Sequence, residues 1–329
     1  MPTVYVLPDQ RLVECRSGEV ILNAALRAGI PFTHACGGRG KCSTCRVVIV
    51  EGWQACAART GKERTIANQL GFGPQFRLAC QTVVNDDVTI RRLVLDERDV
   101  ELTDVRLRQS RDRQHQRQSG RTRPGGRAGR RRARPIGDER QVAVMFADIR
   151  GFTAFVEAVL PYDVIHVLQR QLRDLTSVIE RHGGVVTSYM GDGVMALFTD
   201  DQPDLSGAVS HRAVSAGLEV LAHANAARPG LEELYGRSFD VNVGIHYGTA
   251  IVGTLLGAPT TITAIGDTVN MASRIEQANK QFGTRLLVSD AVRAEVGDAL
   301  TIGRSFTCAL PGKAGQYELF EVLGLAPEP

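Results

Sequence analysis

The chain has 329 residues, 43% of them hydrophobic, and this length and composition allow two compact domains with buried cores. Its net charge is +3, but residues 106–140 carry +10 and the rest of the chain carries −7, so one segment holds the basic character. No run approaches the roughly 18 consecutive apolar residues of a membrane-spanning helix, and the N-terminus lacks the basic and apolar regions of a secretory signal, so we expect a cytoplasmic protein.

Residues 1–103 are predicted to form a first domain of short strands around a loop-rich centre. Apolar residues at helical spacing predict a helix over 20–28, which Gly29 ends. The β-branched residues of 46–50 predict a strand, and 83–95 is expected to contain a further strand pair.

Four of the seven cysteines have a spacing typical of metal ligands, C-x5-C-x2-C-x34-C, and they are Cys36, Cys42, Cys45 and Cys80. Four thiolates suit either a [2Fe–2S] cluster or a structural zinc ion. Gly37, Gly38 and Gly40 let the loop wrap tightly and aim amide N–H groups at its centre, and Ser43 and Thr44 can donate there too. Inorganic sulfides accept such bonds, and zinc sites more often show two C-x2-C pairs, so an iron–sulfur cluster is favoured.

This segment resembles the β-grasp [2Fe–2S] ferredoxins, and its C-x5-C spacing is similar to that of the adrenodoxin-like branch. The resemblance implies that Cys36, Cys42, Cys45 and Cys80 are the cluster ligands, and it leaves room for a redox partner. The three other cysteines match no ligand position and are expected to be small buried hydrophobic residues: Cys15, Cys56 and Cys308.

Residues 104–140 are rich in Arg, Gly and Pro and almost free of apolar side chains. Such a segment buries too little surface to offset the entropy of ordering it, so a flexible linker is predicted. An arm that binds nucleic acid or an anionic membrane is the alternative. No aromatic side chains are interleaved for base stacking, so no clear partner of either kind is predicted, although the arginines leave both open.

Residues 141–324 are predicted to form a second domain in which strands and helices alternate. The expected strands and hairpins lie at 142–146, 185–198, 240–256 and 286–289. The expected helices lie at 152–182, with an interruption at Pro161, and at 205–227 and 268–280. Because hairpins interleave with helices, we expect an α+β sandwich and not a doubly wound sheet.

Polar residues at the ends of these elements are candidates for a phosphate and metal site. Asp148 ends a strand, and Asp192 lies at a hairpin turn between glycines, so two carboxylates can hold metal ions if the strands are neighbours. Asn270 and Arg274 share one helix face and can orient a ribose and neutralise a phosphate. Taken singly, an aspartate in a turn or a polar helix face is more often only structural.

Four segments in order resemble the class III adenylate and guanylate cyclases: FADIRGFT, GDGVMALF, VNVGIHYGTAIVG and IGDTVNMASR. The resemblance spans roughly 141–322. It implies a ferredoxin-like βαββαβ core behind the β-grasp domain, within an α+β fold. It also implies a head-to-tail homodimer, with each active site built from both chains.

The resemblance assigns roles to these candidates. Asp148 and Asp192 bind two Mg²⁺ or Mn²⁺ ions per active site, and Ile149 adds a backbone carbonyl. Asn270 positions the ribose, and Arg274 stabilises the transition state at the α-phosphate.

Three further positions concern the nucleotide. Lys313 falls near the family's triphosphate-binding lysine, although a surface lysine is the alternative. Ser188 occupies the position where adenylate cyclases usually have Lys and guanylate cyclases Glu. Thr263 occupies the second base-reading position, where a bacterial adenylate subgroup has Thr.

We therefore predict an adenylate cyclase that makes 3′,5′-cyclic AMP and pyrophosphate from ATP by two-metal catalysis, with redox regulation by the iron–sulfur domain. A guanylate cyclase acting on GTP is one alternative, since Ser188 lacks the charge of the usual base-reading residues. A ferredoxin electron carrier with a nucleotide-sensing C-terminal domain is the other.

Overall fold

A computed structural model of the chain describes residues 1–93, 137–200, 208–255 and 258–326. The chain divides by its contacts into two compact units. The first contains Met1–Gly126, Ala154–Arg170 and Gly230–Arg237, and the second contains Arg127–Thr153, Gln171–Pro229 and Ser238–Pro329. The expected linker lies outside the described residues except for 137–140. Among the described helices, none is long and apolar enough to cross a membrane.

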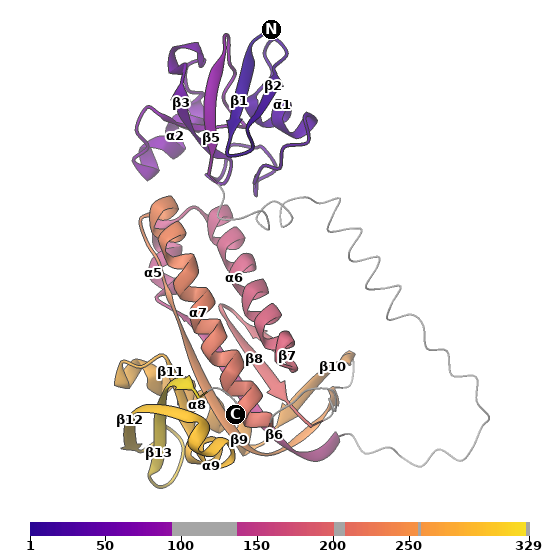
Figure 1. The fold of residues 1–329 in the computed structure, drawn as a ribbon, viewed down its shortest axis with the longest axis vertical. Helices are drawn as coiled ribbons and strands as arrows, with labels where there is room; N and C mark the ends of the chain where they lie inside the picture. Colours follow the sequence, from indigo (N-terminus) through magenta and orange to yellow (C-terminus); the bar gives the residue numbers. More distant parts are fainter. Residues whose placement is uncertain (94–136, 201–207, 256–257, 327–329) are drawn as a thin grey trace, which may run out of the picture. The chain divides into compact units, whose positions relative to one another are not determined.

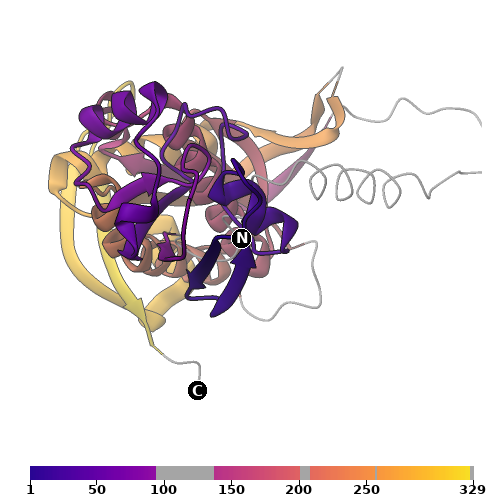
Figure 2. The same ribbon diagram turned by 90° about the horizontal axis from the view of Figure 1, so that it is seen from above.

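The first unit contains a mixed five-stranded sheet in the order β2-β1-β5-β3-β4, with β1 parallel to β5 (Figure 1). The strands are β1 (Thr3–Leu7), β2 (Arg11–Glu14), β3 (Arg46–Glu51), β4 (Phe76–Leu78) and β5 (Val88–Arg92). Its helices are α1 (Ile21–Arg27), the short η1 (Trp53–Ala55) and α2 (Gly61–Leu70). Figure 2 shows the paired strands β1 and β2 from above, next to the N-terminus.

Apolar residues on the inner face of this sheet pack against α1. Val4 and Val6 alternate with exposed Tyr5 along β1, as a half-buried strand requires. Burial then extends to Ile21 of α1 and Ile90 of β5, which belong to the same core. This core therefore fixes the loop that follows α1, which carries three of the four cysteines.

The second unit contains an eight-stranded sheet in the order β12-β13-β11-β9-β6-β8-β7, with β10 paired to β9. Its strands are β6 (Gly137–Arg150), β7 (Gly184–Met190), β8 (Gly193–Phe198), β9 (Asp240–Leu255), β10 (Ala258–Ile265), β11 (Leu286–Ser289), β12 (Leu300–Cys308) and β13 (Tyr317–Leu325). The helices of 152–299 are α5 (Phe152–Ala158), α6 (Pro161–Arg181), α7 (Val209–Tyr235), α8 (Asp267–Phe282), α9 (Asp290–Val296) and η2 (Gly297–Ala299). The order β9-β6-β8-β7 with helices after β6 and β8 is the expected βαββαβ core.

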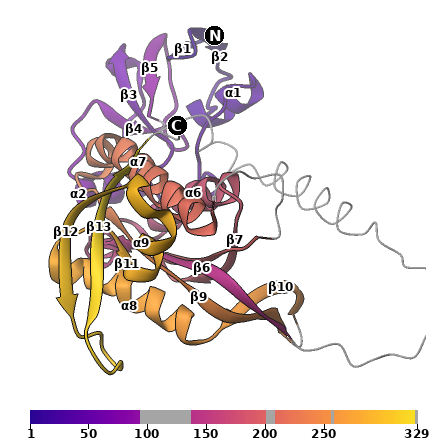
Figure 3. The same cartoon turned by 60° about the horizontal axis from the view of Figure 1, so that its bottom comes forward.

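Strand β6 is buried on both faces from Val142 to Ala147, which explains the continuous apolar sequence of this part of the strand. Met145 belongs to the core that includes Ile179 of α6 and Ala213 of α7. Phe146 faces the opposite side, in a cluster with Ala272 of α8. Figure 3 shows α8 along β9 on this side of the sheet. The expected α+β fold is confirmed, and Asp148 lies where β6 leaves these two cores.

Two element boundaries differ from expectation. Strand β6 begins at Gly137, four residues before the predicted start of the second domain, because its first residues extend the pairing with β9 as far as Gly253. Helix α7 was expected to end at Ala227, yet it continues through Pro229 to Tyr235. Proline removes one helical hydrogen bond, and the continued helix buries Leu231, which is 2% exposed.

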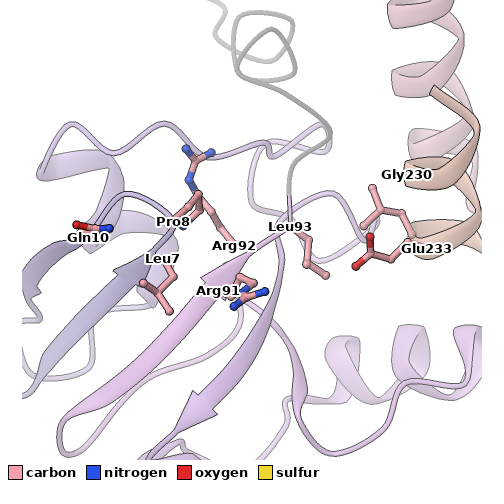
Figure 4. Close-up of a pocket in the computed structure, with 9 residues that line it drawn as sticks. Leu7, Pro8, Gln10, Arg91, Arg92, Leu93, Gly230 and Glu233 are labelled. Carbon is pink, nitrogen blue, oxygen red and sulfur yellow. The ribbon is translucent and has the colours of Figure 1, made fainter. Parts of the chain in front are cut away.

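A pocket of about 600 Å³ lies within the first unit, between the loop after β1, the end of β5 and residues 230–234 of α7 (Figure 4). Arg91 and Glu233 line it with opposite charges. None of the site residues predicted from the sequence lines this pocket, so we assign it no part in the chemistry considered below.

Candidate metal centre and candidate active site

The four candidate cysteines lie in the loop between α1 and β3 and directly after β4. All are buried, with exposed fractions of 3% for Cys36, 0% for Cys42, 1% for Cys45 and 6% for Cys80. They interact in two pairs, Cys36 with Cys42 and Cys45 with Cys80, and within each pair one thiol shifts the pKa of the other. The hydrogen bond from Cys42, followed by several backbone N–H groups, lowers the pKa of Cys36 to about 5 against the effect of burial.

Backbone amides surround these sulfur atoms. The N–H groups of Arg39, Gly40 and Lys41 bond to Cys36, and that of Gly40 also bonds to Cys80. Gly40 has φ +64°, and a Cβ there would lie 3.0 Å from the Gln81 side chain, so the loop needs glycine at this position. Such donors stabilise thiolates and bound sulfide ions, as an iron–sulfur site requires.

The two-by-two pairing distinguishes between the two metal centres left open by the sequence. Within the described residues, no three His, Cys, Asp or Glu side chains gather as ligands of a single metal ion. A structural zinc ion takes four ligands around one centre, whereas a [2Fe–2S] cluster takes two thiolates on each iron. The arrangement therefore fits the cluster.

The remaining cysteines do not belong to the two thiol pairs. Cys15 and Cys308 are buried in two different apolar cores, at 0% and 9% exposure. Cys56 is half-buried against the core of the first unit. Their surroundings are those of small hydrophobic residues.

Asp148 and Asp192 come together at the ends of adjacent strands. Asp148 ends the buried part of β6, and Asp192 lies in the Gly191–Asp192 turn between β7 and β8. A Cβ on Gly193 would lie 2.7 Å from Oδ1 of Asp148, so glycine there lets the turn approach this carboxylate. The predicted proximity of the two aspartates is thus present in a single chain, and Ile149, 2% exposed, follows directly.

The two aspartates bring like negative charges together at this point of the sheet. Burial, followed by the negative charge of Asp192, raises the pKa of Asp148 to about 6, while a backbone hydrogen bond involving Ile149 acts in the opposite direction. A carboxylate whose pKa is raised by a neighbouring negative carboxylate favours binding of a cation between the two.

Sequence reasoning missed two polar residues beside this pair. Burial, followed by the charges of Asp148 and Asp192, raises the pKa of Glu276 on α8 to about 7. Asn242 on β9 pairs with Asp148, is 5% exposed, and its Oδ1 has no hydrogen-bond partner among the described residues. A glutamate in a helix and an asparagine in a strand give no local signal of such a position, because the tertiary packing creates it.

Asn270 and Arg274 lie one turn apart on α8, as predicted. Asn270 is exposed and Arg274 is half-buried, with its Nη1 donating to Oε1 of Gln277 at 3.0 Å. Among the described residues, no hydrogen bond or ion pair connects either side chain to Asp148 or Asp192. The single chain therefore presents the two aspartates and the Asn–Arg pair as separate groups.

The three nucleotide candidates lie on three different elements. Ser188 lies on β7 opposite Met195, and Thr263 lies on β10 opposite Gly253. Lys313 forms an ion pair with Asp267, the first residue of α8, and its side chain is only 12% exposed. Lys313 is therefore held at the N-terminal end of the helix that carries Asn270 and Arg274.

Two family models match the chain. One, described as the adenylate and guanylate cyclase catalytic domain, matches residues 135–310. The other, described as a 2Fe-2S iron-sulfur cluster binding domain, matches residues 4–85.

Curated relatives match each half. Adenylate cyclase 1 of Rhizobium meliloti (strain 1021) is 35% identical over 192 residues, which are 56% of this chain and 28% of the relative. The 2Fe-2S ferredoxin of Escherichia coli (strain K12) is 37% identical over 94 residues, which are 26% of this chain and 85% of the relative. The chain thus spans less than a third of that cyclase but most of the ferredoxin.

Two solved structures resemble the second half. The guanylyl cyclase Cya2 aligns with a TM-score of 0.53 and 26% identity, over 59% of this chain and 96% of that one. The adenylyl cyclase CyaB from P. aeruginosa aligns with a TM-score of 0.51 and 26% identity, over 58% of this chain and 97% of that one. Since their names give different purines, the likeness of fold does not choose between ATP and GTP.

Proposed function

The chain belongs to the adenylate and guanylate cyclase catalytic domain family, and we propose that it converts ATP into 3′,5′-cyclic AMP and pyrophosphate. Its N-terminal part is a [2Fe–2S] ferredoxin domain. The observation that carries the proposal is the approach of Asp148 to Asp192 at the ends of β6 and the β7–β8 hairpin. Their mutual repulsion calls for bound cations.

Asp148, Asp192 and the carbonyl of Ile149 would hold two Mg²⁺ or Mn²⁺ ions. These ions would favour ionisation of the ribose 3′-hydroxyl and neutralise the triphosphate. Two carboxylates cannot fill the coordination of two metal ions, so the remaining oxygen ligands would come from the backbone and from the nucleotide. The chain's contribution is to fix both carboxylates at strand ends, where they need no rearrangement.

We propose that the active enzyme is a homodimer, in which Asn270 and Arg274 of a second copy approach the aspartates. The support is that, among the described residues, no hydrogen bond or ion pair joins these two groups within one chain. Large apolar side chains are also exposed on β7 and β10: Tyr189 is 56% exposed, Met190 45% and Ile265 62%. Such side chains favour a protein–protein contact.

In that dimer Asn270 would hold the ribose so that its 3′-oxygen faces the α-phosphate. Arg274 would donate to the oxygens on which negative charge grows, which is the largest single electrostatic contribution in reactions of this kind. Lys313, already directed to the start of α8 by Asp267, would bind the triphosphate. Proximity and charge therefore supply most of the rate enhancement.

The preference for ATP is supported by Thr263 and by the adenylate cyclase among the relatives. GTP is the second candidate, because the solved guanylyl cyclase is as similar as the adenylyl cyclase and Ser188 carries no base-specific charge. A serine hydroxyl can donate to adenine or accept from guanine, so it excludes neither base.

Purified protein with Mn²⁺ and either ATP or GTP tests this proposal, with cyclic AMP and cyclic GMP measured separately. We expect cyclic AMP in excess, and loss of both products in Asp148→Ala. Asp298→Ala is the matched control, because Asp298 is exposed and lies in the short η2 helix of the same unit. An excess of cyclic GMP would establish the second candidate, and full activity of Asp148→Ala would exclude the proposed site.

We further propose that the redox state of the ferredoxin domain regulates the cyclase. The reason is that one chain contains both a one-electron redox group and a signal-producing catalytic domain. Cyclase rates are expected to differ between dithionite-reduced and air-oxidised protein. Equal rates would contradict this regulation, and absence of any cyclic nucleotide in both states would favour the electron-carrier interpretation, in which the cyclase-like domain only senses nucleotide.

A further inference from the structure

Ser43, in the loop that carries the cysteines, is bound by a carboxylate from a distant part of the sequence. Its backbone N–H lies 3.0 Å from Oδ1 and 3.1 Å from Oδ2 of Asp163, and its hydroxyl donates to Oδ2 at 2.7 Å. Both residues are buried, at 1% and 0% exposure, and both belong to the first unit. Ser43 directly follows Cys42 and precedes Cys45 by two residues, so this contact lies inside the ligand loop.

Asp163 lies in the first turn of α6, whose start is fixed by the bond from the Asp163 N–H to the carbonyl of Leu160. Leu160 is 7% exposed and packs in the same core as Val47 of β3. The helix then runs without a break to Arg181. Further along α6, Ile179 packs in the core that contains β6. Helix α6 therefore begins in the first unit, at the cysteine loop, and its residues from Gln171 onward belong to the second unit.

A second contact follows Cys45. Arg46 is 6% exposed and donates from Nη2 to the carbonyl of Leu234 at 2.5 Å. Leu234 lies in the last turn of α7, at the negative end of the helix dipole, so a cation is well placed there. The guanidinium also lies 4.9 Å from the ring centre of Phe72. The residues that follow two of the cysteine ligands are thus each bound by the end of a long helix.

We propose that Asp163 is a positioning residue for the [2Fe–2S] site, which lowers its reduction potential and connects its redox state to helix α6. This inference rests on the proposed function for its consequence on catalysis, but not for its effect on the potential.

The effect on the potential follows from charge. Reduction places one electron, taken from a one-electron donor, on the cluster beside Asp163, and the donor is oxidised in the same step. A buried carboxylate disfavours that added negative charge. Asp163 also engages the N–H and O–H of Ser43, two donors that would otherwise be available to the cluster sulfides. Both effects lower the potential.

The effect on the helix follows from reciprocity. If the negative charge of Asp163 disfavours reduction, then reduction must disfavour the charged Asp163 carboxylate beside Ser43 by the same free energy. The start of α6 is then held more tightly beside the oxidised cluster than beside the reduced one. This route passes through folded residues and does not depend on the Arg-rich segment for transmission.

The test compares full-length Asp163→Asn with the wild type in a redox titration that follows the visible absorption of the cluster. Asparagine keeps the shape but removes the charge. We expect electron binding to become about tenfold tighter, which is about +59 mV for one electron. Glu157→Gln is the matched control, because Glu157 is an exposed carboxylate in α5 of the same unit, and its potential should equal that of the wild type. A potential of Asp163→Asn equal to that of the control would overturn the proposal.

Ser43→Ala is the second variant, and it tests whether the contact between Asp163 and Ser43 affects the reduction potential even if Asp163→Asn does not fold. It removes the hydroxyl that partly neutralises Asp163, so its potential is expected to fall below the wild-type value. An unchanged potential would contradict a role for this contact.

Cyclase rates separate this inference from the proposed function. The wild type should respond to dithionite and Asp163→Asn should respond less. If neither protein makes cyclic nucleotide but the potentials shift as expected, the proposed function fails and Asp163 keeps its role at the cluster. If the potentials shift and Asp163→Asn responds to dithionite as the wild type does, the connection to α6 is refuted.

Discussion

Gly244 on β9 lies against the backbone of Glu276 on α8, so closely that a Cβ on Gly244 would come within 2.1 Å of the Glu276 amide nitrogen. Only glycine permits this approach. The contact brings the Glu276 carboxyl within electrostatic reach of Asp148 and Asp192, and burial together with these charges raises its pKa to about 7. Helix α8 therefore supplies both a negative group near the aspartates and the positive Arg274.

Glu276→Gln is expected to stabilise the metal-free protein at pH 8 and to have little effect at pH 5. An acid whose pKa is raised on folding contributes most to the stability of the fold at pH values below its pKa in the unfolded state, here 4.5. This stability is lost as the pH rises through its folded-state pKa of about 7. Because the amide stays neutral, the variant avoids this loss of stability, which is on the order of 1–2 kcal/mol after solvent screening. Thermal unfolding of both proteins in EDTA at pH 5 and pH 8 measures the difference in stability.

Exposed Glu180 of α6 provides the control for this measurement. Glu180→Gln should change the unfolding temperature little and equally at both pH values. A gain for Glu276→Gln that is the same at pH 5 and pH 8 would contradict a raised pKa as its cause.

The sequence alone predicts those site residues that lie at the end of a strand or in a recognisable turn. Asp148 follows an apolar strand and Asp192 lies between turn glycines, so both could be predicted. The alternation of elements indicated an α+β fold, and the βαββαβ order was implied by the resemblance to the cyclases. The Asp163–Ser43 contact could not be predicted, since 120 residues separate its partners and neither has a distinctive local pattern. Glu276 was missed for the same reason, because Gly244 on a different strand determines its position.

Replacement of a cluster ligand is expected to remove the iron. Cys45→Ser should lose the visible absorption and the iron of the purified protein, since serine is a poorer ligand for iron than thiolate. Cys56→Ala should keep both, because Cys56 lies against the core and away from the two thiol pairs. Iron and acid-labile sulfide are measured per chain. One zinc ion per chain, without sulfide, would refute the two-iron centre.

Lys313→Ala is expected to raise the KM for the nucleotide about tenfold, which corresponds to about 1.4 kcal/mol of lost binding. Lys313 is directed to the N-terminal end of α8 by Asp267, where a triphosphate would approach. Lys280→Ala, at the exposed C-terminal end of the same helix, is the control and should keep the wild-type KM. Initial rates over a range of ATP concentrations give both values, and equal KM values for the two variants would exclude Lys313 from substrate binding.

Two inactive variants are expected to restore activity to one another when mixed. Asp148→Ala would remove the metal-binding group, and Arg274→Ala would lower kcat by about 10²–10³ through loss of a transition-state donor. If each active site takes its aspartates from one chain and its Asn–Arg pair from another, a mixed dimer contains one intact site, and random exchange yields about a quarter of wild-type activity. Measurement after co-refolding or co-expression checks this.

Asp148→Ala mixed with Asp192→Ala is the control and should stay inactive, because both changes affect the same half of the site. No activity in the first mixture would place all these residues in a single chain, and activity in the control would place the two aspartates of one site in different chains.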